Sequence, residues 1–277
     1  MTLSVSLPFG LGLFETMRTY NGRIFREAEH LERLFESAKT AGVTDLPGKE
    51  ILRRELKSAV TAYMKEHRPV RDLFLRLSLW NRQIFVMVGE KQHPKTVYQK
   101  GVTLRTSPVK RSLSNASPPE AKTSAYQNPL FASFEPSSSE VYEWVFLDQN
   151  GYVTEVRIGN IFIVQRDARP LLLTPPAQGI LNGVTRRFVI KCAHEIGLGV
   201  REAPLTRHDI FNAEEAFLTN TSWEILPVRK LDGRKIGQKI PGPETLKLHR
   251  HFKQKILKEC PPRKSTGRLS ASRTKPG

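Results

Sequence analysis

The sequence has little cysteine and no long apolar run. Cys192 and Cys260 are its two cysteines and do not stand in Cys-x-x-Cys spacing, so we expect neither a disulfide framework nor a thiolate zinc site. No apolar run approaches the roughly 18 residues of a membrane span. Residues 1–9 also lack the charged start and apolar core of a secretory signal. We therefore expect a cytoplasmic protein with no membrane partner.

Several local enzyme motifs are also missing. The chain has no GxxxxGK[ST], GxSxG or HExxH pattern and no EF-hand loop, which argues against the enzyme and calcium-binding classes that those motifs mark. Gly10 and Gly12 lack the third glycine of a dinucleotide fingerprint. The seven histidines are scattered, and so no metal site is expected.

Acidic residues are scarce relative to basic ones. The 27 Asp and Glu face 44 Lys and Arg, a net charge of +17, in a chain of otherwise ordinary globular composition. Residues 251–277 hold much of this excess and, from Pro261 onward, are predicted to be a disordered basic tail. The segment from Pro261 to the end has no aromatic residue on which bases could stack, which argues against nucleic acid as a partner.

Hydrophobic periodicity predicts a mixed α+β chain. Residues 30–42 and 50–67 show helical spacing, while residues 71–79, 83–88 and 101–106 are expected to be strands. The length of 277 residues suits two domains. We place a small N-terminal domain at residues 1–109.

A polar segment with two prolines, residues 110–120, is the predicted interdomain linker. The larger domain is expected at residues 121–250, followed by the end of the last helix and the tail at 251–277. Further elements are predicted there: strands 142–147, 152–156, 161–164, 215–219, 225–231 and 234–236, and helices 184–196 and 243–257.

A glycine-containing turn leads directly into a predicted helix at Val184. Backbone N–H groups and the Thr185 hydroxyl would converge at the positive end of that helix, where phosphate binds well. An ordinary Gly/Thr helix cap would give the same pattern. The sequence therefore allows either an anion site or a simple cap at this position.

Seven blocks, in this order, resemble the class IV aminotransferases, the fold-type IV enzymes that use pyridoxal 5'-phosphate (PLP). The blocks are GLGLFETMRTYNGRIF, HLERLFESAKTAG, AKTSAYQNPLFAS, FLDQNGYVTEVRIGNIFIV, LLTPPAQGILNGVTRR, EEAFLTNTSWEILPV and GPET. The resemblance implies a small N-terminal α/β domain and a larger C-terminal domain with a mixed sheet and flanking helices. It also implies a homodimer that binds PLP and passes an amino group from an amino acid to a 2-oxo acid, with branched-chain amino acids as one candidate class of donor.

The resemblance also assigns roles to residues around the cofactor ring. Lys122 matches the catalytic lysine, which binds the cofactor covalently and moves the α-proton. Glu155 matches the glutamate that keeps the pyridine nitrogen protonated. Tyr126 matches the tyrosine at the ring hydroxyl. Without the resemblance, Lys122 would be taken for a solvated loop lysine and Glu155 for a surface acid on a strand.

The resemblance also assigns residues to the two parts of the site that bind anionic groups. Arg33, Val184, Thr185 and Thr221 match the residues that bind the phosphate. Arg76 matches a position that holds the substrate carboxylate in some members, and Phe14 is expected to line the substrate pocket. These positions are predictions that come from the resemblance alone.

Two other functions stay open at this point. Aminodeoxychorismate lyase belongs to the same family and uses the same cofactor and lysine to release pyruvate and 4-aminobenzoate. A nucleic-acid-binding remnant of the fold is a minor alternative. Only residues 1–9 precede the first block, fewer than in most members, so we expect the first strands of the small domain to be shortened or replaced.

Overall fold

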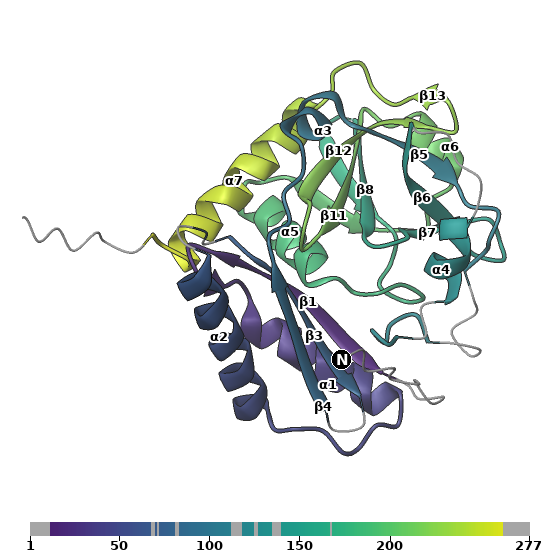
Figure 1. Cartoon of the computed structure of the whole chain (residues 1–277). Coiled ribbons are helices and arrows are strands. Elements are labelled where there is room, and N and C mark those ends of the chain that lie inside the picture. The colour runs from purple at the N-terminus through teal and green to yellow at the C-terminus, as the bar shows by residue number, and fades with distance from the viewer. Residues whose placement is uncertain are drawn as a thin grey trace, which may run out of the picture.

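The computed structural model describes residues 12–67, 70, 72–80, 83–111, 118–124, 127–134, 140–166 and 168–262 (Figure 1). Tyr126, the N-terminal residues 1–11, the middle of the predicted linker and the predicted tail beyond residue 262 lie outside the described residues. Within the described part, no helix combines the length and the apolar character that crossing a membrane would need.

The N-terminal part of the chain forms an antiparallel four-stranded sheet backed by two helices. Its strand order is β2-β1-β3-β4. The strands are β1 (Leu13–Tyr20), β2 (Arg23–Ile24), β3 (Phe74–Trp80) and β4 (Gln83–Gly89), and the helices are α1 (Glu27–Thr40) and α2 (Lys49–Glu66). The predicted helical stripes and the alternating leucines of β3 form one apolar core between sheet and helices. The opposite face of β3, which carries Phe74, Arg76 and Ser78, does not belong to this core.

The rest of the chain forms a mixed nine-stranded sheet. The order is β10-β9-β8-β11-β12-β5-β6-β7, and β13 pairs with β12. Its strands are β5 (Val102–Thr106), β6 (Val141–Leu147), β7 (Val153–Val156), β8 (Asn160–Arg166), β9 (Pro170–Thr174), β10 (Gly199–Glu202), β11 (Glu215–Asn220), β12 (Glu224–Leu231) and β13 (Arg234–Lys235). Parallel pairs, β9 with β10 and β5 with β6 and β12, occur beside antiparallel ones.

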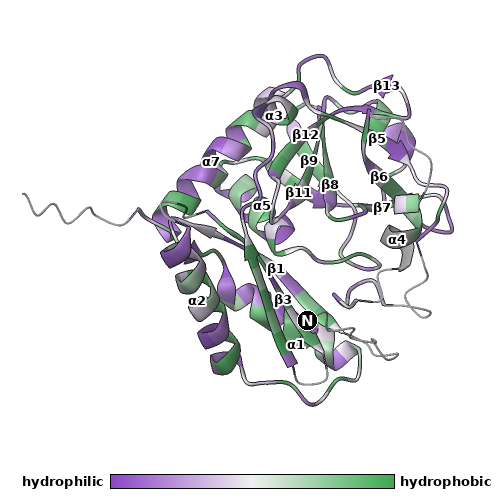
Figure 2. Ribbon diagram, viewed as in Figure 1, coloured by the Kyte–Doolittle hydropathy of each residue, from purple (hydrophilic) through white to green (hydrophobic). Residues whose placement is uncertain are grey.

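Helices cover one face of this sheet and its margins. The helices are α3 (Lys95–Lys100), α4 (Gln127–Phe134), α5 (Val184–Glu195), α6 (Arg207–Phe211) and α7 (Pro243–Glu259). Helices α5 and α7 share an apolar cluster with β8 and β11, and a second cluster fills the other side of the sheet. Figure 2 shows hydrophobic residues along β3 and β12, and hydrophilic and hydrophobic residues alternating around α2 and α7. The two sheets, each covered by helices, agree with the predicted α+β class.

One predicted strand belongs elsewhere than expected. Residues 101–106 were assigned to the N-terminal domain, but β5 pairs with β6 and β12 of the nine-stranded sheet. The reason is that the chain leaves β4, passes through the short helix α3 and enters the second sheet as a parallel strand, a connection that local periodicity does not reveal. The domain boundaries themselves stay a prediction.

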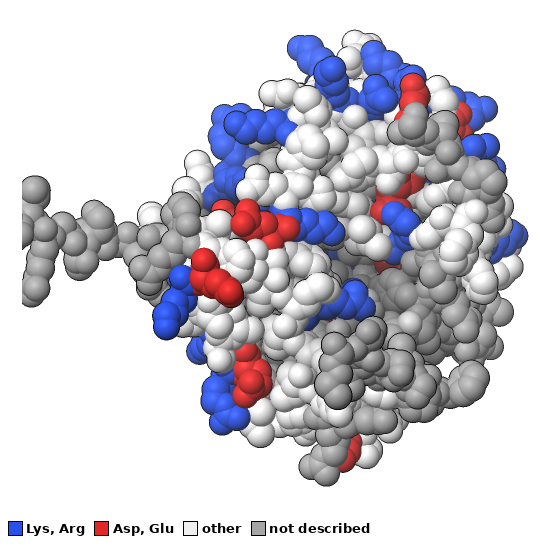
Figure 3. Space-filling view, viewed as in Figure 1, with Lys and Arg blue, Asp and Glu red and all other residues white. Residues whose placement is uncertain are grey.

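Positive charge is distributed over the surface. Figure 3 shows lysine and arginine side chains at several places on the visible face, with acidic groups between them, rather than in one patch. The surface charge of this face therefore indicates no single docking site for a polyanion.

Candidate active site

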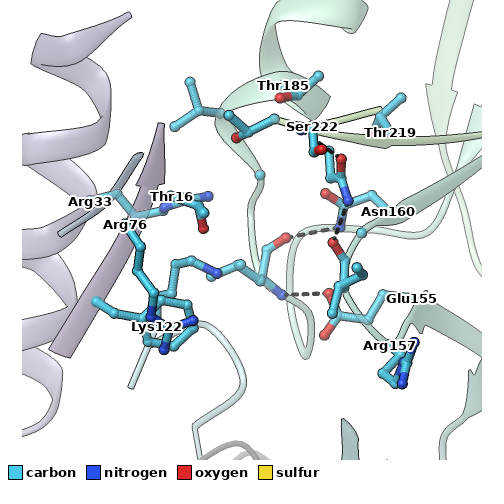
Figure 4. Close-up of a pocket in the computed structure, with 18 of the residues that line it drawn as sticks. Thr16, Arg33, Arg76, Lys122, Glu155, Arg157, Asn160, Thr185, Thr219 and Ser222 are labelled. Carbon is cyan, nitrogen blue, oxygen red and sulfur yellow. Dashed lines mark hydrogen bonds between the residues drawn. The ribbon is translucent and has the colours of Figure 1, made fainter. Parts of the chain in front are cut away.

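A cavity of about 340 Å³ lies between the two sheets. Its wall includes residues of β1, α1 and β3 on one side and of β7, β11 and α5 on the other (Figure 4). The predicted site residues within the described part of the chain all line it: Phe14, Arg33, Arg76, Lys122, Glu155, Val184, Thr185 and Thr221. Segments far apart in the sequence thus meet at one place.

Lys122 is buried in the wall of this cavity rather than solvated. Its backbone N–H donates to Ser37 Oγ at 3.0 Å, and its carbonyl accepts from Phe14 N at 3.3 Å, so α1 and β1 both fix the segment. Its Nζ lies 4.3 Å from the centre of the Phe14 ring. Burial, and then the neighbouring Arg33 guanidinium, lower the pKa of Lys122 to about 8. A considerable share of this amine is therefore neutral near physiological pH.

Glu155 lies across the cavity from Lys122 and is also buried. One carboxylate oxygen is 2.5 Å from Arg111, and the other accepts from Leu181 N at 3.3 Å. Burial raises the pKa of Glu155 to about 7, while Arg111 opposes the rise. The carboxylate is thus held at the cavity wall, and its pKa lies close to neutral pH.

The start of α5 forms another part of the wall. Gly183 is its N-cap residue, and no side chain of the described residues caps the helix. A Cβ at Gly183 would come within 2.4 Å of Asn160 Oδ1, so the helix start packs tightly on β8. The first N–H groups, at Val184 and Thr185, therefore lie at the cavity without a side-chain cap, which favours the anion site over the simple cap.

Arg33 lies beside this helix start. It is off the apolar stripe of α1, yet it is only 6% exposed. Its Nε and Nη2 donate to both oxygens of Glu15, at 2.7 and 2.8 Å, and its Nη1 donates to Asn182 O at 3.4 Å. Glu15 is not among the site residues predicted from the sequence. An acid between the apolar residues Phe14 and Met17 was the available signal.

The loop after β11 completes this side of the cavity. The hydroxyl Oγ1 of Thr219 is buried and has no hydrogen-bond partner among the described residues. Asn220 Oδ1 accepts from the backbone N–H groups of Ser222 and Trp223, which fixes the turn that contains Thr221. A buried hydroxyl that lacks a partner is costly unless a ligand supplies one.

Arg76 and Phe14 form the floor at the four-stranded sheet. The Arg76 guanidinium carbon lies 4.0 Å from the centre of the Phe14 ring, and its Nε donates to Ser78 Oγ at 3.4 Å. An arginine held over a ring can offer its other N–H groups to a carboxylate.

Comparisons with known proteins agree with this site. The family described as "Amino-transferase class IV" matches residues 12–231. A branched-chain-amino-acid aminotransferase of Pseudomonas aeruginosa is 31% identical over 90% of this chain and 85% of its own length. A D-alanine aminotransferase of Bacillus licheniformis is 29% identical over 91% and 89%. A solved T.th. branched-chain amino acid aminotransferase with pyridoxamine 5'-phosphate has a TM-score of 0.77 and 29% identity, over 90% and 86% of the two chains.

Fold and matches together define an aminotransferase that works with PLP. The chain belongs to the class IV aminotransferase family. The resemblance, the fold-type IV architecture, the enzyme class and the cofactor predicted from the sequence are thereby confirmed.

The described residues fit this cofactor. A phosphate would meet the uncapped start of α5 and Arg33, while a buried lysine of lowered pKa and a buried carboxylate lie on opposite sides of the same cavity. Burial of such polar or charged groups costs free energy unless a charged or polar ligand compensates for it. The cavity is therefore suited to an anionic, aldehyde-bearing molecule.

Proposed function

We propose that this aminotransferase acts on amino acids with apolar, branched side chains and passes their amino group to a 2-oxo acid. The observation that carries the proposal is the placement of Lys122, Arg33 and Glu155 around one cavity that apolar side chains, Phe14, Phe74 and Ile158, also line. The name of the Pseudomonas relative supports the substrate class. The D-alanine relative makes the chirality of the donor part of the test.

The cofactor would be held at its phosphate, at Lys122 and at its ring nitrogen. Arg33, the N–H groups of Val184 and Thr185, and Thr221 would bind its phosphate, and Lys122 would bind it covalently. PLP supplies an aldehyde for the amino group and a ring that accepts electrons when the α-proton leaves.

Glu155 would face the ring nitrogen. Its carboxylate would accept that N–H and keep the nitrogen protonated, and Arg111 and the Leu181 N–H hold the carboxylate in place. Burial keeps water away from this contact.

Lys122 would carry the proton transfer. Its Nζ would take the proton from the substrate α-carbon once the substrate amine has replaced it, since a base with a pKa of about 8 is well matched to neutral pH. Burial and the Arg33 guanidinium disfavour the charged amine and so keep the base available.

Arg76 would hold the substrate carboxylate while apolar groups receive the side chain. The guanidinium lies on Phe14 in the cavity floor, and Phe74 and Ile158 also line the wall. A carboxylate at one end and an apolar lining beside it match an amino acid with a hydrocarbon side chain.

The function is tested by incubating the purified protein with PLP, 2-oxoglutarate and a panel of L- and D-amino acids. We expect glutamate to form with L-leucine, L-isoleucine or L-valine. Lys122→Ala should abolish it, whereas Lys100→Ala, which changes an exposed lysine, should not. Conversion of D-alanine alone would contradict the substrate proposal. Release of 4-aminobenzoate from aminodeoxychorismate would instead support the lyase alternative.

We also propose that the enzyme is a homodimer. Phe85 and Met87 on β4 are 51% and 59% exposed and lie opposite Ser78 and Arg76 in the strand pairing, so they share the face of the sheet that floors the cavity. Exposed apolar side chains on an edge strand favour burial against another chain. Light scattering should give twice the chain mass, and Phe85→Asp with Met87→Asp should reduce it to a monomer. A monomeric wild type would refute this.

A reducing, cytoplasmic setting is part of the proposal. Cys192 and Cys260 are both buried within the described residues, and neither forms a disulfide. Fractionation of the producing cell would test it.

A further inference from the structure

Glu15 is a charged residue in an apolar core, behind the wall of the active-site cavity. It is 0% exposed and shares its face of β1 with Leu13 and Met17, which pack against α1 and α2. Burial of a carboxylate in such a place destabilises the fold unless charged or hydrogen-bonding partners compensate for it. Its partners therefore indicate why an acid is needed there.

Two residues of α1 hold this carboxylate. Arg33 binds both oxygens through Nε and Nη2, at 2.7 and 2.8 Å, and His30 Nδ1 lies 2.8 Å from Oε2. Burial alone would raise the pKa of Glu15, but Arg33 and His30 hold it well below its usual range. Burial lowers the pKa of His30, while Glu15 opposes that effect. A carboxylate only accepts hydrogen bonds, so the ring donates to it from Nδ1.

Lys122 is affected by both Arg33 and Glu15. Charged side chains line the cavity with it from several elements: Arg33 on α1, Arg76 on β3, Glu155 on β7, and Lys91 and Arg157 in neighbouring loops. Burial lowers the pKa of Lys122 most, and Arg33 lowers it further, while Glu15 and Glu155 oppose that effect. Arg33 and Glu15 thus act on the lysine in opposite directions.

We propose that Glu15 is a positioning residue of the active site, which fixes the Arg33 guanidinium in the cavity wall and balances its charge beside the Lys122 amine. The bidentate contact leaves Nη1 of Arg33 to reach Asn182 O at the helix start. Without the Glu15 charge, the same guanidinium would repel a protonated Lys122 more strongly. The importance of this effect for catalysis rests on the proposed function of Lys122. The effect of Glu15 and Arg33 on the pKa of Lys122 does not depend on that function.

The test measures the titration of Lys122 in the full-length protein without cofactor or substrate. Trace acetylation with acetic anhydride at a series of pH values, read by mass spectrometry of the peptide that carries Lys122, gives the midpoint at which the amine becomes reactive. Glu15→Gln should move that midpoint down by about one pH unit, the size expected for loss of a nearby opposite charge. Glu15→Asp keeps the charge and should stay close to wild type.

A buried carboxylate far from Lys122 provides the control. Glu215 caps α7 by accepting from the N–H groups of Glu244 and Thr245, so Glu215→Gln should lower stability without moving the midpoint. An unchanged midpoint in folded Glu15→Gln, or an equal fall in Glu15→Asp, would overturn the proposal.

A second variant keeps the proposal testable if Glu15→Gln does not fold. Arg33→Gln leaves the Glu15 charge uncompensated, and the Lys122 midpoint should then rise. A midpoint that stays or falls would overturn the proposal. Because the assay contains no substrate, an inactive enzyme would leave this result untouched, and the two proposals fail independently.

Discussion

Replacing Gly159 with alanine is expected to weaken cofactor binding as well as the fold. A Cβ at this position would lie 2.6 Å from the carbonyl oxygen of Thr219 and 3.0 Å from a ring carbon of Trp223. Contacts this close force a displacement, and Thr219 is paired with Asn160, the residue after the glycine. The carbonyl therefore cannot withdraw without moving the end of β11 and the loop that carries Thr221.

The size of the effect follows from overpacking. Forcing an additional methyl group into a packed site costs about 1–3 kcal/mol. In a chain of this size we expect the midpoint of thermal unfolding to fall by about 2–5 °C. Displacement of the loop should also weaken PLP binding by about tenfold, equivalent to about 1.4 kcal/mol.

Two measurements and one control variant separate these effects. Thermal unfolding without cofactor reports the cost to the fold, and a PLP titration followed by absorbance reports the dissociation constant. Gly89→Ala is the matched control, because no described atom lies within 4 Å of its added Cβ. If Gly159→Ala unfolds at the wild-type temperature, the steric reasoning is wrong. If it loses stability but binds PLP with unchanged affinity, the loop does not hold the cofactor.

Three further outcomes follow from the same structure. Capture of PLP by the cofactor-free enzyme should quicken with rising pH and level off above the Lys122 pKa of about 8, because the neutral amine reacts; a rate still rising at pH 10 would contradict the lowered value. Arg76→Met should raise KM for the amino acid while PLP affinity stays unchanged, as measured by steady-state kinetics beside a PLP titration; equal losses in both would remove its carboxylate role. Glu215→Ala should lower the free energy of unfolding in urea by about 0.5–2 kcal/mol, since two N–H groups at the start of α7 lose their acceptor, and should leave KM unchanged.

The sequence identified the amphipathic elements well because their periods are local. The stripes of α1 and α2 and the alternating leucines of β3 were predicted and lie in the core. Strand β1 was missed because both of its faces are largely buried, so it lacks a period of two. The Asn21-Gly22 turn after it, with φ of 52° and 77°, was the signal that could have identified a hairpin.

The site was harder to predict because its parts interact over long separations. Arg33 lies off the apolar stripe of its helix, and its partner Glu15 lies on another element, so the pattern of the helix does not predict its burial. Lys122 and Glu155 each looked like surface residues in their local context, and only the family resemblance connected them. The cavity then depends on how two sheets meet, which no local pattern contains. Hydrophobic periodicity therefore predicted elements, while the resemblance predicted the site.

The charge balance of the cavity indicates how many anionic groups it can accept. Among the described residues, five cationic side chains line it: Arg33, Arg76, Lys91, Lys122 and Arg157. Glu155 is the carboxylate on the same described wall, and Arg111 behind it cancels its charge. Glu15 and Glu143, behind the wall, offset two of the cations. About three positive charges remain when Lys122 is protonated and about two when it is neutral, which is close to the charge of a phosphate of nearly two negative charges together with one substrate carboxylate. A cofactor and an amino acid thus match the charge of the cavity, while most of the +17 net charge of the sequence lies elsewhere in the chain.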